Sequence, residues 1–149
     1  EVRRHVVSGS VQDPEIRALV VSGVTDGSNP LVRLRSIQVM GTSGAESDQV
    51  RVALTGALQH DPSAAVRAKA LEGLKQFAGD PAVRSALASV VQTDNDASVR
   101  IQAIGLLAAH GDGSIVGALQ NAVQKEDNPM VRAQMVNLLA NLGASPGTY

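Results

Sequence analysis

The sequence predicts an all-α fold, a solenoid of about four helix pairs stacked as a right-handed superhelix. Its main evidence is a repeated Val-Arg pair, which begins at Val32, Val66, Val99 and Val131, at spacings of 34, 33 and 32 residues. Periods in this range are typical of stacked repeats, each of which is one supersecondary unit. Two further observations support the prediction: apolar residues follow each pair at helical spacing, and prolines mark the helix starts.

The residues after each Val-Arg pair predict one helix of the repeat. Apolar residues stand four, five and eight positions after the valine, and the single exception is Ser36. Since each residue turns a helix by about 100°, these positions share one stripe. The residues of the stripe are Ser36, Ala70, Ala103 and Met135; Ile37, Leu71, Ile104 and Val136; and Met40, Leu74, Leu107 and Leu139.

A second apolar series lies before each Val-Arg pair and predicts another helix. Its members recur three and four residues apart, as on one face of a helix. They are Ile16, Val50, Val83 and Ile115; Leu19, Ala53, Ala86 and Ala118; and Val20, Leu54, Leu87 and Leu119. Each repeat therefore has a first helix and a second helix.

Prolines and their neighbours set the expected boundaries. Five of the six prolines follow Asp or Asn, a pairing that favours a helix start. The predicted helices span 14–25, 30–41, 47–60, 62–77, 81–93, 97–110, 113–125 and 129–142. They form one repeat domain over 13–143, with repeats at about 13–43, 46–78, 80–110 and 112–143.

The two ends of the chain are interpreted separately. In residues 1–12, Val2-Arg3 is followed by Val6 and Val7, which matches the start of a second helix and predicts the remnant of a preceding one. Residues 144–149 are predicted to be an irregular tail. Because the chain begins with Glu1 rather than Met, we expect it to be processed or cut from a longer parent.

Composition argues against several partners and cofactors. The net charge is −1, from 13 basic and 14 acidic residues, so nucleic acid and anionic lipid are not expected. Cysteine is absent, and no apolar run is long enough for a membrane span, so this segment is not expected to insert directly into a membrane. We predict no cofactor and no metal site, since His5, His60 and His110 are far apart in sequence. The expected partner is another protein.

No group of residues has the arrangement of a catalytic site. The sequence shows no Ser/His/Asp or Cys/His combination, no paired acids on a recognisable loop and no Gly-rich phosphate loop. The chain is therefore predicted not to be an enzyme, and no catalytic residue is assigned.

The four arginines of the Val-Arg pairs are predicted to be structural. These are Arg33, Arg67, Arg100 and Arg132. An arginine directly after the buried valine points toward the buried stripe, where it can bind turn carbonyls and acids such as Asp61 and Asp94. An anion-binding groove is the alternative. A second series, Arg17, Arg51 and Arg84, is interpreted as solvated surface charge.

The outer side of the second helices is the candidate partner-binding surface. Positions three and six after each valine lie opposite the buried stripe and carry mixed polar side chains. An ordinary solvated face is the alternative interpretation. The candidate residues are Arg35, Gln38, Lys69, Glu72, Gln102, Gln134 and Asn137.

The Asp-Pro or Asn-Pro turn, the Val-Arg pair and the two-helix unit resemble HEAT-like repeats, an α-solenoid family, over about 13–143. The run 61–100, the run 126–132 and the closing 143–149 resemble the C-terminal repeats of bacterial membrane-anchored proteins similar to zinc-finger anti-sigma factors. That resemblance implies a sensory or regulatory domain on the extracytoplasmic side of the inner membrane; without it, a cytoplasmic location is expected.

The resemblance to HEAT-like repeats also implies alternative functions. A HEAT-like lyase or nucleic-acid-modifying enzyme is one, although glycosylases of this kind need a basic concave face and aromatic residues that the chain lacks. A passive architectural spacer is the other.

Overall fold

The computed structural model describes residues 9–10, 12–25, 29–42, 48–110, 112–144 and 146. This part of the chain holds eight α-helices and two short 3-10 helices, and no strand, which confirms the predicted all-α solenoid. The elements are α1 (Pro14–Thr25), α2 (Pro30–Thr42), α3 (Asp48–His60), α4 (Ala64–Gly73), η1 (Leu74–Phe77), α5 (Pro81–Thr93), α6 (Ala97–His110), η2 (Gly113–Ile115), α7 (Val116–Lys125) and α8 (Pro129–Asn141).

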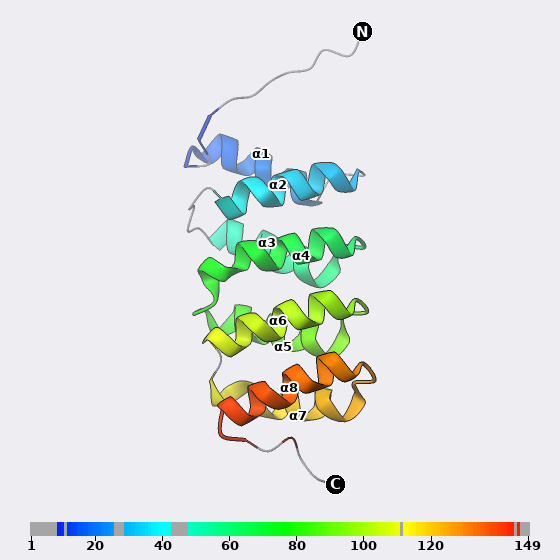
Figure 1. Cartoon of the computed structure of the whole chain (residues 1–149). Helices are drawn as coiled ribbons and strands as arrows, with labels where there is room; N and C mark the ends of the chain where they lie inside the picture. Colours follow the sequence, from blue (N-terminus) through cyan, green and yellow to red (C-terminus); the bar gives the residue numbers. More distant parts are fainter. Residues whose placement is uncertain are drawn as a thin grey trace.

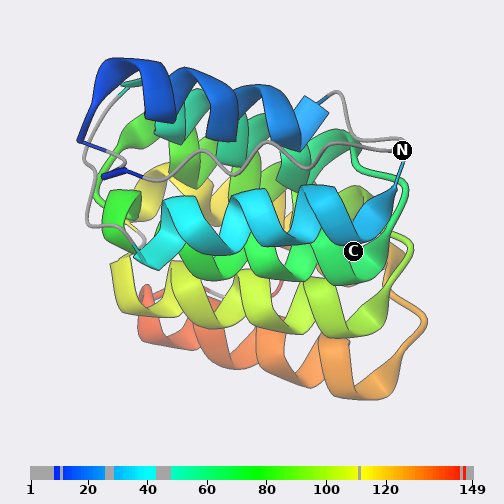
Figure 2. The same cartoon turned by 90° about the horizontal axis from the view of Figure 1, so that it is seen from above.

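The helices form four layers, each of one first helix and one second helix (Figure 1). Seen from above, α1, α3, α5 and α7 occupy one side and α2, α4, α6 and α8 the other, and successive second helices are displaced in the same direction (Figure 2). The handedness of the superhelix stays a prediction. Of the remnant predicted over 1–12, residues 1–8 and 11 lie outside the described residues, as do 43–47 and, in the predicted tail, 145 and 147–149.

Polar residues at the helix starts explain why the boundaries fall where they do. The side chain of Asp80 accepts a hydrogen bond from the Ala82 N–H at 2.7 Å, and the side chain of Asn128 accepts from the Met130 N–H at 3.0 Å. In both cases a proline occupies the first helical position, where a missing N–H costs nothing.

Two predicted helices differ in detail from those in the structure. The helix expected over 62–77 begins at Ala64, because Ser63 is extended and the Asp61 carboxylate accepts the Ser63 N–H at 2.9 Å. It then tightens into η1 at Leu74. The helix expected from 113 starts with η2 and becomes α-helical at Val116.

The core consists of aliphatic side chains from both helices of every layer. Leu54, Leu87, Leu107 and Leu139 are fully buried, and they come from positions that the apolar stripes predict. Among the described residues no aromatic side chain is fully buried, and Phe77 packs against the core half-buried, so the layers are separated mainly by aliphatic groups. At the closest point, a Cβ added to Gly41 of α2 would lie 3.2 Å from the Cα of Gly73 in α4.

None of the helices in the described ranges is long and apolar enough to cross a membrane.

The close approach of α2 and α4 predicts the effect of a larger side chain. We expect Gly41→Val to destabilise the protein by about 1 to 3 kcal/mol, because the new atoms meet backbone rather than a flexible side chain. Chemical denaturation measures the change. Gly105→Ala is the control, since no neighbouring atom lies near its added Cβ, and it should stabilise the exposed helix by about 0.5 to 1 kcal/mol. Equal stability of the Gly41→Val variant and the parent would contradict the described packing.

Candidate functional site

The arginines of the Val-Arg pairs form a continuous row of contacts along one edge of the stack, which we call the arginine ladder. Arg67 of α4 donates through Nε to Asp94 Oδ2 at 2.8 Å and through Nη2 to Asp94 Oδ1 at 2.9 Å. Its Nη1 donates to the Asp61 carbonyl oxygen at 3.0 Å. One guanidinium group thus joins the turn of its own layer to the turn of the next layer.

The neighbouring layers show the same arrangement. Arg33 binds the Asp61 carboxylate at 2.7 and 3.1 Å, and Arg100 binds the Glu126 carboxylate twice at 3.0 Å. Arg100 also donates to the Asp94 carbonyl oxygen at 2.7 Å. The carboxylates of Asp61, Asp94 and Glu126 therefore each bind the guanidinium group of the preceding layer. The backbone carbonyls of Asp61 and Asp94 accept a hydrogen bond from the arginine of their own layer.

Burial makes these contacts stronger than ordinary surface ion pairs. The side chains of Arg67 and Asp94 are 9% and 4% exposed. The hydrogen bond to Asp94 raises the pKa of Arg67 above its ordinary value, and the bond to Asp61 does the same for the pKa of Arg33. Both groups stay positively charged wherever the protein is folded, since arginine is protonated at all ordinary pH values.

The ladder changes at its C-terminal end. Arg132 donates through both Nε and Nη2 to the carbonyl oxygen of Glu126, and its side chain is exposed. Glu126 rather than Asp127 supplies the third carboxylate, because it occupies the same place in its repeat as Asp61 and Asp94.

The second arginine series also binds the following layer, so its interpretation as solvated charge was wrong for two members. Arg51 lies 3.4 Å from Asp80, and Arg84 lies 3.3 Å from Asp112, with side chains only 24% and 15% exposed. Arg84 also donates to the Gly79 carbonyl at 2.7 Å. Acids in the interlayer loops thus create a second, weaker set of contacts. The series does not continue into the last repeat, where Val116 stands at the equivalent position.

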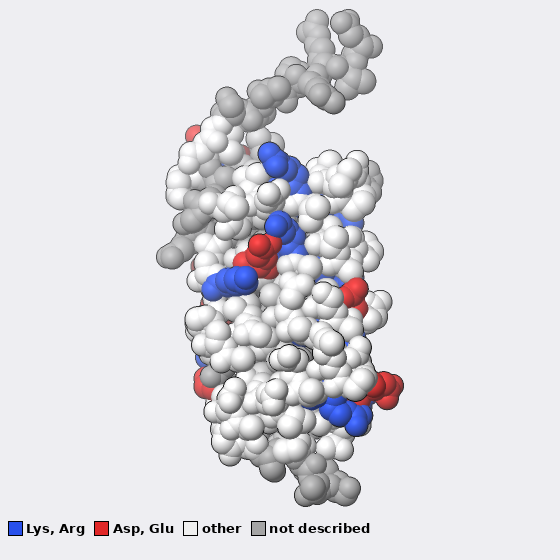
Figure 3. Space-filling model, viewed as in Figure 1, with Lys and Arg blue, Asp and Glu red and all other residues white. Residues whose placement is uncertain are grey.

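The predicted partner-binding residues, here called the polar strip, lie on the second helices. Arg35 and Gln38 of α2, Glu72 of α4, Gln102 of α6, and Gln134 and Asn137 of α8 are exposed, and Lys69 of α4 is half-buried. Most charged side chains in this view lie over the upper half, at the level of α2 and α4, and a smaller basic and acidic group lies at the lower right, at the level of α8 (Figure 3).

Charged members of the polar strip pair within their own helices. Lys69 Nζ lies 2.6 Å from Glu72 Oε2, and this hydrogen bond lowers the pKa of Glu72. Arg35 donates to Gln38 at 3.4 Å. Only the Lys69 and Glu72 charges offset each other, so the strip keeps one net positive charge, that of Arg35. Whether the strip binds a partner stays a prediction.

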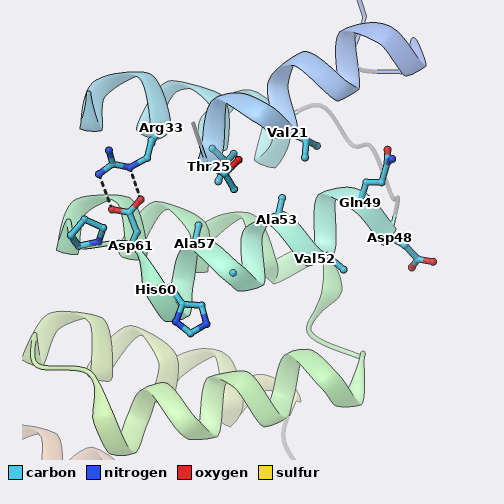
Figure 4. Close-up of a pocket in the computed structure, with 13 residues that line it drawn as sticks. Val21, Thr25, Arg33, Asp48, Gln49, Val52, Ala53, Ala57, His60 and Asp61 are labelled. Carbon is cyan, nitrogen blue, oxygen red and sulfur yellow. Dashed lines mark hydrogen bonds and ion pairs between the residues drawn. The ribbon is translucent and has the colours of Figure 1, made fainter. Parts of the chain in front are cut away.

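The structure also contains a hollow on the side of the first helices, which we call the apolar cleft. It lies between α1 and α3 and has a volume of about 800 Å³. Val24 and Ala57 are buried at its base, whereas Val52 is 61% exposed. The Arg33 and Asp61 pair lies at one end, and Asp48 and Gln49 lie at the other (Figure 4).

The corresponding grooves between later layers are smaller and carry more polar groups. The groove between α3 and α5 has a volume of about 460 Å³ and includes Ser89, Thr93 and Asn95. Between α5 and α7 the volume is about 420 Å³, and the lining includes Ser85 and Ser114. An open apolar lining thus distinguishes the first groove from these two.

The sequence analysis missed the apolar cleft because it did not compare the exposed apolar positions of the first helices. A signal was present at one exposed position, where Val52 corresponds to Ala18, Ser85 and Gly117 in the other repeats. Two of the three histidines lie in different layers of the described structure. His60 borders the apolar cleft, and His110 is exposed at the end of α6. His5 lies outside the described residues.

Layers of paired helices, joined by buried contacts from each second helix to the following turn, define an α-solenoid protein. The family model for HEAT repeats matches residues 17–108 and 85–148, so the chain belongs to the HEAT repeat family. No curated protein sequence matches the chain.

Removing one ladder arginine should destabilise the stack. We expect Arg67→Ala to lower the free energy of unfolding by about 3 to 5 kcal/mol, because it leaves the buried Asp94 carboxylate without its cation. Arg67→Lys should recover only part of this loss, since a lysine cannot reproduce the planar fork. Urea denaturation followed by circular dichroism measures both.

Arg132→Ala is the matched control at the end of the arginine ladder, and it should cost far less because Arg132 is exposed and contacts no carboxylate of a following layer in the described chain. An unchanged melting temperature for Arg67→Ala would refute the structural role and revive the anion-binding alternative.

Proposed function

We propose that this HEAT repeat protein is a non-enzymatic scaffold that binds a partner protein, with the apolar cleft as the principal contact. HEAT repeats are commonly protein-interaction scaffolds. The observation that carries the proposal is the open apolar lining between α1 and α3, where Val52 is largely exposed. Exposed apolar concavities of this kind mark binding sites more often than ordinary surface does.

The chemistry of the apolar cleft indicates what the partner presents. Aliphatic side chains from α1 and α3 cover the base and sides, so a partner gains by burying its own apolar side chain there. Charged groups lie at the ends, with the Arg33 and Asp61 pair at one end and Asp48 at the other, while Thr25 lies between them (Figure 4). Hydrogen bonds at these ends would orient the partner along the cleft.

The polar strip is the second candidate contact surface. It lies on the opposite side of the layers from the apolar cleft, and it offers hydrogen-bonding groups without a strong net charge. Lys and Arg side chains on the face shown in Figure 3 are few, and several lie beside acids. This pattern favours a protein partner over a nucleic acid, whose phosphates need a broad positive surface.

A charge in the apolar cleft should abolish partner binding. Val52→Asp places a carboxylate in the apolar lining, where it cannot be desolvated without a large cost. Ser85→Asp is the matched control, because Ser85 occupies the same exposed position one repeat later. In quantitative affinity capture, we expect the parent and the Ser85→Asp variant to bind the same partner protein. The Val52→Asp variant should not bind it. Equal capture by all three would rule out the apolar cleft.

Charge reversal tests the polar strip independently. The triple change Arg35→Glu, Lys69→Glu and Glu72→Lys keeps these positions charged and reverses each sign. If the strip contributes, the affinity for the captured partner should fall by about tenfold or more, as expected when several interfacial charges are mismatched. Unchanged affinity would exclude the strip and leave the apolar cleft as the contact surface.

A finer proposal concerns the biological setting. We propose that the scaffold is the sensory or regulatory domain of a membrane-anchored, anti-sigma-factor-like protein in bacteria, and that partner binding is transmitted along the stack. Its support is the sequence resemblance in 61–100, 126–132 and 143–149. Reading the coding sequence before Glu1 tests it: about 20 apolar residues preceded by a His/Cys zinc motif are expected. A native chain that starts near Glu1 would contradict it.

A further inference from the structure

The N-terminal end of the stack has an apolar surface that the described part of the chain leaves open. It is formed by α1 and α2 and contains a hollow of about 260 Å³. We call this surface the end face. It is lined by Ile16, Leu19, Val20, Arg35, Ser36 and Val39.

Comparison with the other repeats shows that the end face is an internal surface without its cover. The residues equivalent to Ile16 and Val20 in the later layers are 0 to 3% exposed; they are Val50, Val83, Ile115, Leu54, Leu87 and Leu119. Ile16, Val20 and Val39 are only half-buried, and Leu19 is 54% exposed.

The cover in the later layers is the preceding layer, whose first helix packs against the next first helix and whose second helix packs against the next second helix. Helix α2 approaches α4 so closely that Gly41 and Gly73 are in near contact. In the same way, positions equivalent to Val39 are buried in α6 and α8, as Leu106 and Leu138. The end face therefore has the shape and the apolar chemistry that receive a second helix of the repeat's own type.

At the opposite end of the stack, the chain turns back after α8 and contacts the last layer. Gly143 adopts a positive φ of 73°, and Ala144 then donates its N–H to the Leu139 carbonyl at 2.9 Å. Gln124 of α7 donates to the Pro146 carbonyl at 3.3 Å, so the segment after α8 is held against the last layer. The two ends therefore differ in degree: described chain lies against the C-terminal end, although Val136, the equivalent of the buried Ile37, Leu71 and Ile104, is half-buried there.

We propose that the end face is the docking surface for the segment from Val2 to Val7 of the same chain. This segment has the Val-Arg pair and the valines at positions four and five that begin every second helix. The path of the chain agrees, because Gly9 lies against the end face: a Cβ added there would be 2.8 Å from Ile16 Cγ1. Val6 and Val7 supply the aliphatic groups that the hollow accepts. The proposal does not depend on the proposed function.

A single reporter thiol tests the proposal in the full chain, which has no cysteine of its own. In a Val39→Cys variant, the rate of reaction with a soluble disulfide reagent measures access to the end face. Adding Val6→Asp should raise this rate by about tenfold or more, because an aspartate cannot be buried in the hollow. Circular dichroism checks that the fold is retained.

Two controls separate docking from a general change in stability. His5→Asp adds the same charge three positions after Val2, where the equivalent residues Arg35, Gln102 and Gln134 are exposed, and it should leave the rate unchanged. A Val52→Cys reporter should be insensitive to Val6→Asp. Equal reaction rates of the Val39→Cys thiol with and without Val6→Asp would overturn the proposal. So would a rate that falls as protein concentration rises, which would identify a second copy as the occupant.

Discussion

The stack depends on guanidinium groups that each donate hydrogen bonds to the turns of two consecutive layers. An arginine side chain can donate two parallel hydrogen bonds to a carboxylate and donate a further one to a carbonyl through its remaining nitrogen. Arg67 and Arg100 use this geometry to connect their own turn to the next. Because the acids also accept backbone N–H groups two residues ahead, the same contact fixes both the turn and the interlayer spacing.

A framework fixed in this way allows exposed positions to vary without changing the fold. The buried stripes hold the layers together, and the exposed side of the first helices then determines what each groove offers. Val52 gives an apolar cleft, whereas Ser85 and Ser89 give the next grooves a more polar lining. A repeat protein can thereby present a different binding surface in each layer with few changes of sequence.

Most of the fold was predictable from the sequence, since helix periodicity and the Asp-Pro or Asn-Pro starts are local signals. The helix bounds agree within about two residues, with two exceptions: α4 ends at Gly73, where η1 continues to Phe77, and α7 begins only at Val116, after η2. The candidate site was predictable only in part. Val21 and Val52 line the apolar cleft from different layers, and Arg51 meets Asp80 far along the chain, so neither relation has a local signal.

The central claim is that the arginine ladder couples the layers energetically, and a double-mutant cycle on Arg67 and Asp94 tests it most directly. The single and double alanine variants are compared by urea denaturation, with the exposed Lys69 and Glu72 pair as a reference cycle. The account predicts a coupling of about 2 kcal/mol or more for the buried pair and less than about 0.5 kcal/mol for the exposed pair. Equal, near-zero coupling for both pairs would contradict it.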